Sequence, residues 1–579
     1  MRKVLQQLKQ YKRNAFLCIG MTALEVIMEI LMPFVTAIII DQGLEAANLP
    51  VVYRYGILIV AMAVLSLIFG ALAGKNAASA SAGLAANLRE AIYANIQTFS
   101  FSNIDKFSVP GLVTRMTTDI TNVQNAFMMI IRVAVRAPLN LIFSFAMCLY
   151  INVQLSWMFL IAVAFLVIVI GVIMVVTLRI FNRVFKKYDD LNASVQENVT
   201  AIRVVKAFVR EDYEDKKFSK ASNTLYKMFV KAEGLLAFNN PAMMVAVYFC
   251  IISVSWFGAQ FIVGGTLSTG DLTSLFSYIM ALLMSLMMLS MVVVMISMSL
   301  ASIRRISEVL SETPDLKDSE HPVMEVKDGQ IDFNHVNFSY KHGSGKNALS
   351  DIDLHIHSGE TIGVIGGTGS GKSSLVNLIC RLYDVDDGSV CVGGVDVRQY
   401  DTEVLRNQVS VVLQKNTLFS GSILQNLRWG NLDATEEDCI EACKAACADE
   451  FIDRMPEGYR TRIERGGNNV SGGQKQRLCI ARALLKKPKV LILDDSTSAV
   501  DTATDAKIRR AFAEKIPGTT KIIIAQRISS VESADRILVL DDGKIDAFDT
   551  HENLLKNNAI YQEIYTSQKE GGGDFDQPA

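Results

Sequence analysis

Six long apolar stretches in the first 300 residues constrain this chain more than any other feature. A helix needs about 20 apolar residues to cross the hydrocarbon core of a bilayer. Because every backbone polar group inside a bilayer must be bonded within its own segment, such stretches form helices. The sequence therefore predicts an all-α membrane domain over 1–314, with six transmembrane helices at 15–40, 56–74, 128–151, 155–179, 242–264 and 272–298.

The connections between these stretches differ in length and charge. Those after stretches 1, 3 and 5 are short, whereas those after stretches 2 and 4 run to about 50–60 residues. The apolar residues of "LNASVQENVTAIRVVKAFVREDYEDKKF" recur at helical spacing, so helices should continue beyond the membrane. A soluble domain is expected to dock onto turns near Asn103–Phe107 and Tyr213–Phe218. The fourth connection is rich in basic residues: Arg179, Arg183, Lys186, Lys187, Arg203, Lys206, Arg210, Lys216, Lys217 and Lys220.

The basic N-terminus and this basic connection set the expected orientation. By the positive-inside rule, both termini and both long connections lie in the cytoplasm. This topology fits the plasma membrane or the bacterial inner membrane, with a eukaryotic organelle as the alternative. The net charge of −2 gives no reason to expect a nucleic-acid partner.

Charged residues inside the apolar stretches need an explanation, because a charge at the centre of a bilayer costs several kcal/mol. Glu25 and Glu29 lie four residues apart in the first stretch, and Arg132 and Arg136 lie four apart in the third. One hypothesis is that the two helices form ion pairs. The other is that the glutamates face a watery cavity and attract cationic substrates.

Methionines form a stripe along the sixth stretch, at steps of three or four residues. Methionine is flexible and polarizable, and it suits surfaces that accept ligands of many shapes. The stripe indicates either packing between helices or a promiscuous apolar substrate cavity. Its members are Met280, Met284, Met287, Met291, Met295 and Met298.

After residue 300 the apolar runs shorten and strands are expected from about residue 330. The sequence predicts a linker over 315–329, an α/β nucleotide-binding cassette over 330–568 and a flexible tail over 569–579. The nine cysteines show no disulfide framework. Three of them, Cys439, Cys443 and Cys447, recur at helical spacing, and helix packing is favoured over a metal site.

The strongest motif is "TIGVIGGTGSGKSSLVNLIC", where a β-rich run meets a glycine loop and a helix. Residues Gly366 to Ser373 match G-x-x-x-x-G-K-S. The loop amides surround phosphate oxygens, Lys372 supplies charge to the outer phosphates, and the Ser373 hydroxyl reaches Mg²⁺. The predicted ATP-binding residues here are Gly366, Gly367, Thr368, Gly369, Ser370, Gly371, Lys372, Ser373 and Ser374.

Two further elements accompany the glycine loop. The apolar run "KVLILDD" predicts a buried strand that places Asp494 near the magnesium ion. In "NVSGGQKQRLCIARALL", the residues Ser471, Gly472 and Gly473 form a second phosphate-facing element at the start of a helix. Together the motifs predict an α/β P-loop NTPase cassette that uses ATP and Mg²⁺.

With these motifs in place, the chain resembles a half-transporter of the ATP-binding cassette (ABC) exporter family over its whole length. The resemblance implies that Tyr340 stacks on adenine and that Gln414 senses magnesium and contacts the membrane domain. It makes Ser471–Gln474 the signature motif, which touches ATP held by a partner chain, with Val470 where leucine is usual. It makes Ser498–Asp501 the loop that crosses to the other cassette, the D-loop.

Two residues depart from the family pattern. Asp495 occupies the position of the hydrolytic glutamate, and Gln526 replaces the switch histidine in "IAQRIS". Aspartate is shorter by roughly 1.5 Å, and about 1 Å of misplacement of a general base can cost about 100-fold in rate. Glutamine cannot become a cation near the γ-phosphate. The two changes together indicate a site that binds ATP but hydrolyses it slowly.

In the architecture that the resemblance implies, two cassettes pair head to tail around two ATP molecules. The absence of the glutamate and the histidine from this chain therefore bears on what its partner must supply. We expect a heterodimer with a second, homologous half-transporter that supplies the glutamate and the histidine. The expected activity is ATP-driven export of amphiphilic drugs by alternating access. Lipid or peptide cargo, or transport in the other direction, is the first alternative. A regulatory or receptor-like membrane subunit that binds nucleotide without turning it over is the second.

Overall fold

Long helices build the membrane half of the chain, because its apolar stretches must bond their own backbone groups. The structure, a computed structural model, describes residues 2–340, 347–495 and 500–571. These group into two compact units, one of Met1–Thr98 with Phe107–Glu312 and one of Phe99–Lys106 with Thr313–Ala579. The main helices of the first unit are α1 (Arg2–Gln6), α2 (Lys12–Ile38), α3 (Leu49–Gln97), α5 (Val109–Thr114), α6 (Ile120–Ile151), α7 (Val153–Thr200), α8 (Ile202–Ala207), α9 (Glu211–Ala237), α10 (Asn239–Val263) and α11 (Thr269–Val309).

Six helical segments within the described residues are long and apolar enough to cross a membrane, which confirms the predicted six-helix membrane domain. Each contains or overlaps one of the six predicted stretches. The 49 residues of α3 extend over about 70 Å at 1.5 Å per residue, roughly twice the ~30 Å of a hydrocarbon core. The segments are Lys9–Glu45, Leu49–Gln97, Val109–Ile151, Val153–Phe181, Glu211–Val263 and Thr269–Val293.

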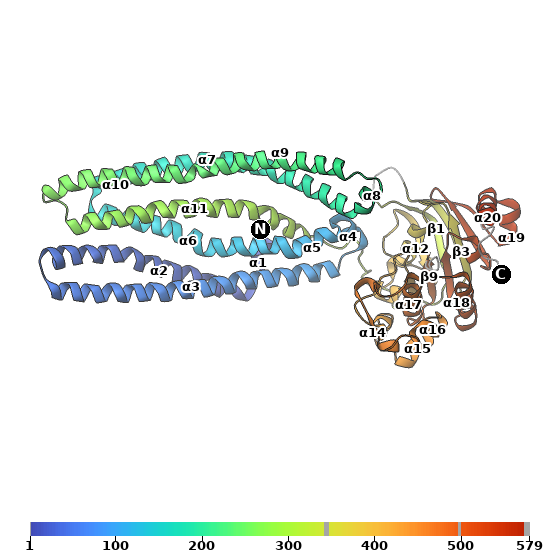
Figure 1. The fold of residues 1–579 in the computed structure, drawn as a ribbon. Coiled ribbons are helices and arrows are strands. Elements are labelled where there is room, and N and C mark those ends of the chain that lie inside the picture. Colours follow the sequence, from blue (N-terminus) through green and yellow to red (C-terminus); the bar gives the residue numbers. More distant parts are fainter. Residues whose placement is uncertain (1, 341–346, 496–499, 572–579) are drawn as a thin grey trace. The chain divides into compact units, whose positions relative to one another are not determined.

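The helices of this unit pair along their lengths (Figure 1). Helix α2 packs on α3, α6 on α11, and α7 on both α9 and α10. An apolar core forms where α2, α7, α10 and α11 meet, around Val26, Leu155, Cys250 and Leu282. Many of the remaining large apolar side chains are exposed along the outer helix faces, as expected of a surface that meets lipid rather than water.

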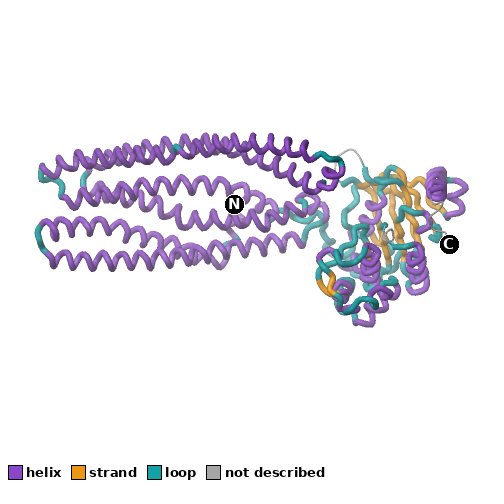
Figure 2. Tube along the Cα trace, in the orientation of Figure 1, coloured by secondary structure: helices purple, strands orange, loops and turns teal. Residues whose placement is uncertain are grey.

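The second unit is built on strands, which Figure 2 shows in orange. Its larger sheet has the order β12-β11-β3-β10-β9-β6, and only β12 runs antiparallel to its neighbour. A second, antiparallel sheet has the order β2-β1-β4-β5, and β7 pairs with β8. The strands are β1 (Ile331–Phe338), β2 (Leu349–Ile356), β3 (Thr361–Gly366), β4 (Asp387–Val392), β5 (Val395–Asp396), β6 (Val409–Val412), β7 (Gly421–Ser422), β8 (Arg462–Ile463), β9 (Val490–Asp494), β10 (Thr520–Ile524), β11 (Arg536–Asp541) and β12 (Lys544–Asp549).

Helices cover the parallel sheet, whose central strands β9 and β10 are buried along their whole length. This α/β layering confirms the predicted cassette fold. The helix α4 (Phe101–Phe107), which joins α3 to α5, has all but its last residue in this second unit. The other helices are α12 (Lys372–Ile379), α13 (Thr402–Gln408), α14 (Ile423–Leu427), α15 (Glu436–Ala445), α16 (Asp449–Ile452), α17 (Gly472–Leu484), α18 (Thr502–Lys515), α19 (His551–Asn557) and α20 (Ala559–Gly571).

Two segments that we predicted to lie outside the cassette, the linker 315–329 and the start of the tail at 569, differ from that prediction. In the expected linker, Val326 is buried in the cassette core, and the Val323 backbone bonds to that of Gln399 and Asp401. The segment therefore packs on the cassette instead of standing free. Helix α20 continues through 569–571, which we expected to belong to the tail.

The three cysteines at helical spacing pack inside the cassette. Cys439, Cys443 and Cys447 are all buried, on α15 or just after it, and belong to one apolar cluster. Burial raises the pKa of the Cys443 thiol, which keeps it protonated. This agrees with the packing role that the sequence favoured.

Candidate functional site

The topology of the parallel sheet places the predicted nucleotide residues at one edge. Strand β10 lies between β3 and β9, and β6 lies beyond β9. Since these strands run parallel, the loops that follow them leave the sheet at the same edge. Those loops carry the glycine loop after β3, Asp494 and Asp495 at the end of β9, Gln526 after β10 and Gln414 after β6.

The glycine loop between β3 and α12 has no room for side chains at two of its positions. A Cβ atom on Gly366 would lie 2.2 Å from the Leu540 carbonyl oxygen. Gly371 caps α12 with a φ of 98°, and a Cβ atom there would lie 2.7 Å from a Leu349 methyl carbon. Glycine is therefore required where the backbone turns into the helix.

The ammonium group of Lys372 lies inside this loop. It donates to the carbonyl oxygens of Gly366 at 2.9 Å and Gly367 at 2.7 Å. Burial lowers the pKa of Lys372, against the attraction of Asp494 and Asp495. A lysine held this way is desolvated and close to the α12 N-terminus, so it fits a phosphate group as its charge partner.

Ser373 and Asp494 meet beside the loop. The Ser373 hydroxyl donates to Asp494 Oδ2 at 3.2 Å, and burial raises the pKa of the Asp494 carboxyl. A hydroxyl and one carboxylate are the hard oxygen ligands that suit Mg²⁺, which usually takes its other ligands from phosphates and water. These two residues would hold the ion, whose charge would favour the ionised form of Asp494.

Asp495 is held by both neighbouring glutamines. Gln526 Nε2 donates to Asp495 Oδ2 at 2.7 Å, and Gln414 Nε2 donates to the same oxygen at 3.2 Å. Asp495 itself adopts a φ of 47°, a left-handed conformation uncommon for residues other than glycine. The structure thus brings together the two positions that depart from the family pattern, along with the predicted magnesium-sensing glutamine.

Tyr340 stands in an aromatic cluster that reaches α4. Its hydroxyl lies 3.0 Å from Ser374 Oγ, and its ring is 5.1 Å from that of Tyr383. Tyr383 donates its hydroxyl to Asp105 Oδ2 of α4 at 2.8 Å and packs beside the Phe101 ring. The predicted docking turn near Asn103–Phe107 thus contacts the cassette through residues next to the predicted adenine position.

The predicted signature begins α17. Ser471 accepts a hydrogen bond from Gln474 N at 3.3 Å, and Gln474 Oε1 accepts from Ser471 N at 2.9 Å. This capping box leaves Ser471 and Gly472 exposed at the helix start. Asp501 caps α18 by accepting from Thr504 N at 2.9 Å, whereas Ser498 lies outside the described residues.

The charged residues of the membrane unit form an ion cluster between α2 and α6. Arg136 donates to Glu25 at 2.8 Å and to both carboxylate oxygens of Glu29 at 2.6 and 2.8 Å. Glu25 is only 7% exposed. This geometry favours the ion-pair hypothesis over glutamates left free for a cationic substrate.

The methionine stripe faces away from the core of its own unit. Met280, Met284, Met287 and Met291 are 45, 50, 38 and 66% exposed, whereas Leu282 on the same helix is buried. Met295 is half-buried, and the side chain of Met298 is outside the described part. Packing within the chain's own core therefore does not account for the exposed methionines.

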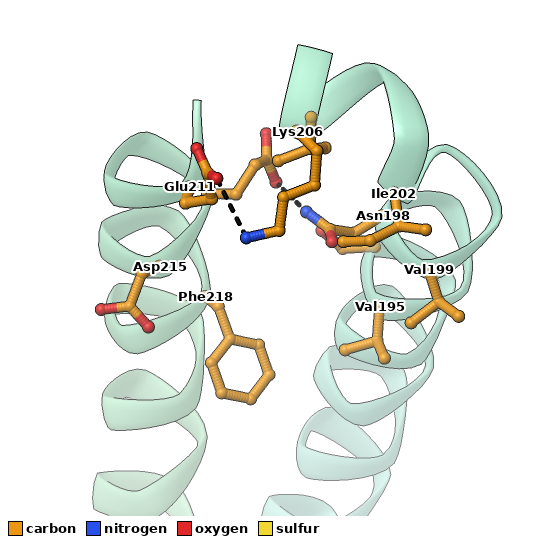
Figure 3. A pocket seen from close by; sticks show the side chains of 11 residues that line it. Val195, Asn198, Val199, Ile202, Lys206, Glu211, Asp215 and Phe218 are labelled. Atoms are coloured by element: carbon orange, nitrogen blue, oxygen red, sulfur yellow. Dashed lines mark hydrogen bonds and ion pairs between the residues drawn. The ribbon is translucent and has the colours of Figure 1, made fainter. Parts of the chain in front are cut away.

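The turn from α7 to α9 carries a separate pocket, shown in Figure 3. It has a volume of about 380 Å³ and an apolar lining that includes Val195, Val199 and Phe218. Lys206 pairs with Glu211 at 3.0 Å at one rim, and Asn198 donates to Glu214 at 3.0 Å. Nearby, Phe208, Val209 and Tyr213 are strongly exposed, so the second predicted docking turn presents an apolar surface.

One ion pair was missed by the sequence reasoning. Asp119, fully buried just before α6, accepts from Arg305 Nε of α11 at 2.7 Å and from Ser302 Oγ at 2.8 Å. The only signals in the sequence were an aspartate just before one long apolar helix and an arginine near the end of another. Nothing in their spacing of 186 residues could have paired them.

Comparisons with known proteins identify the same two parts of the chain, a transmembrane region and a cassette. Residues 15–287 match the family model described as the ABC transporter transmembrane region, and 349–498 match the one described as ABC transporter. The chain is 35% identical over 568 residues to the ABC transporter ATP-binding protein YfiB of Bacillus subtilis, covering 98% of each chain. It is 33% identical over 466 residues to an ATP-dependent lipid A-core flippase of Desulfotalea psychrophila, covering 79% of this chain and 80% of the flippase.

The fold also matches a solved structure, that of a bacterial Atm1-family ABC exporter with ATP bound. The TM-score is 0.83 at 24% identity, over 96% of this chain and 99% of that one. Three observations assign the family. Within its described residues the chain has six helices long and apolar enough to cross a membrane and a cassette with a glycine loop, and a relative is matched over nearly its full length. The chain belongs to the ABC transporter family and has the exporter fold, with one transmembrane region and one ATP-binding cassette.

Proposed function

We propose that this chain is one subunit of a heterodimeric ATP-driven exporter and that its own glycine loop holds ATP at a slow site. The observation that carries the proposal is the bonding of Asp495 to two carboxamides, from Gln526 at 2.7 Å and Gln414 at 3.2 Å. A general base must direct a free carboxylate oxygen at its water. Here one oxygen of an already short side chain receives both amide donors.

The intact parts of the site support retention of nucleotide. Lys372 lies in the glycine loop, Ser373 and Asp494 lie together, and Tyr340 is half exposed for a base to stack on it. A partner cassette with a glutamate and a histidine would form the hydrolytic site with the Ser471–Gln474 signature of this chain. ATP binding then closes the cassettes and turns the spans outward, and hydrolysis at the partner's site reopens them.

The cargo we propose is amphiphilic, either a drug or a lipid-like compound. The exposed methionine stripe on α11 offers an adaptable apolar surface. A relative is a lipid A-core flippase, which favours the lipid-like class as the second candidate. The expected setting is the bacterial inner or plasma membrane with both termini in the cytoplasm, because the long basic connections favour that side.

The ATPase activity of the purified chain tests the slow site. We expect the lone chain to hydrolyse ATP at no more than a few per cent of the rate of the complex with its partner. Asp495→Glu combined with Gln526→His should raise the rate of the lone chain at least ten-fold, with Lys372→Ala as the background. A brisk wild-type rate that Asp495→Asn abolishes would defeat the proposal. The partner should be a co-purifying chain of similar mass.

A further inference from the structure

The C-terminal helix α20 bonds directly to the backbone at and just after the predicted switch position, Gln526. Gln568 Nε2 donates to the Gln526 carbonyl oxygen at 2.7 Å, and Gln568 Oε1 accepts from the Ile528 N–H at 2.8 Å. One carboxamide thus satisfies a backbone acceptor and a backbone donor two residues apart, as a neighbouring strand would. The side chain is 40 and 42 residues away in sequence from the groups that it bonds.

Helix α20 is itself firmly attached to the cassette. Tyr561 is fully buried, and its hydroxyl lies 2.7 Å from His551 Nδ1 of α19. Ile560, Ile564 and Tyr565 pack against the cassette core. The helix is therefore a fixed support from which Gln568 can hold the switch loop.

The bonds continue from the switch backbone to the candidate site. The Gln526 side chain donates to Asp495 at 2.7 Å, and the Asp495 N–H donates to the Ile524 carbonyl at 3.0 Å. On the other side, Arg509 Nη1 of α18 donates to the Ser529 carbonyl at 2.8 Å. The loop 526–529 is thus pinned from α20 and from α18, and Gln526 projects from its start.

We propose that Gln568 is a positioning residue that fixes the switch loop, and that α20 thereby controls how long ATP stays on this chain. The proposed control of ATP retention rests on the proposed slow site. The Gln526 side chain is short, so it can reach Asp495 or a terminal phosphate only from a backbone that is held in one position. Loss of the Gln568 bonds frees that backbone and loosens the site without removing any residue that touches nucleotide.

The same helix offers a matched control. Gln562 Nε2 donates to the Leu555 carbonyl at 2.7 Å, so this glutamine ties α20 to α19 and not to the switch loop. Gln562→Ala removes a side chain of the same size and type from the same helix. Gln568→Glu keeps the acceptor for the Ile528 N–H but loses the donor to the Gln526 carbonyl.

Hydrogen–deuterium exchange in the full chain without nucleotide tests the positioning role. Gln568→Ala should speed exchange in a peptide covering 526–530 about five-fold, as expected for one lost net hydrogen bond. Gln562→Ala should leave that peptide unchanged, and Gln568→Glu should give an intermediate rate. Equal exchange in Gln568→Ala and wild type, or equal acceleration in both alanine variants, would overturn the proposal.

Release of a fluorescent ATP analogue from the full chain tests the control of retention. Gln568→Ala should release the analogue several-fold faster than wild type, and Gln562→Ala should match wild type. Faster exchange without faster release would overturn only the proposed control of ATP retention by α20. Brisk hydrolysis by the wild-type chain would defeat the proposed slow site and leave the exchange result standing, so the two failures are distinguishable.

Discussion

At the residue scale, the ion cluster in the membrane unit depends on one arginine. Within the described residues, Arg136 forms ion pairs with both Glu25 and Glu29, and the Glu25 side chain is only 9% exposed. Its second carboxylate oxygen, Oε2, is buried and has no hydrogen-bond partner within the described residues. A buried carboxylate left with fewer partners pays a desolvation cost that no other contact offsets.

Arg136→Gln should therefore destabilise the protein by on the order of 3 kcal/mol, because it strands the buried charge of Glu25. Glu29→Gln should cost less, since the Glu29 side chain is 31% exposed. Thermal unfolding in detergent micelles measures both effects. Adding Glu25→Gln to Arg136→Gln should recover part of the loss, and a double variant less stable than the single one would contradict the pairing.

At the element scale, a hydrogen bond within an aromatic cluster joins α4 to the cassette. Tyr383 donates to Asp105 of α4 at 2.8 Å, and its ring contacts those of Phe101, Phe338 and Tyr340. Burial, together with the hydrogen bond to Asp105, raises the pKa of Tyr383. The phenol therefore stays protonated and can donate throughout the neutral pH range.

Tyr383→Phe keeps the ring and removes only this hydrogen bond, so we expect a loss of about 1–2 kcal/mol in stability. Asp105→Asn should weaken the same bond. In a double-mutant cycle, the two changes together should cost clearly less than the sum of the single losses. Strict additivity in thermal unfolding would show that the two side chains do not interact.

At the scale of the whole molecule, the two sides of α11 serve different surroundings. Leu282 lies in the core of the membrane unit, whereas Met284 is half exposed two residues later. Because the rest of the described chain does not bury Met284, this side chain is available to cargo or to a partner chain. Stability and transport should therefore respond to different residues of one helix.

Leu282→Ala should lower stability by about 2–5 kcal/mol through the cavity that it leaves. Met284→Ala should change stability by less than about 0.5 kcal/mol, yet alter which dyes or lipids the assembled transporter moves. Thermal unfolding and transport into inverted vesicles measure the two effects. Equal destabilisation by both substitutions would place Met284 in the core and contradict the exposed stripe.

Local sequence patterns alone determined the six spans, the strand–loop–helix order around the glycine loop and the positions of Asp494, Asp495 and Gln526. Each of these depends on residues within one turn, strand or helix, where periodicity and glycine placement act directly. The tertiary structure alone decided that Arg136 bonds both glutamates, that Gln414 and Gln526 share one oxygen of Asp495, and that Gln568 bonds the backbone of Gln526 and Ile528. Such contacts join groups 31 to 111 residues apart, and only packing sets which of many compatible polar groups meet.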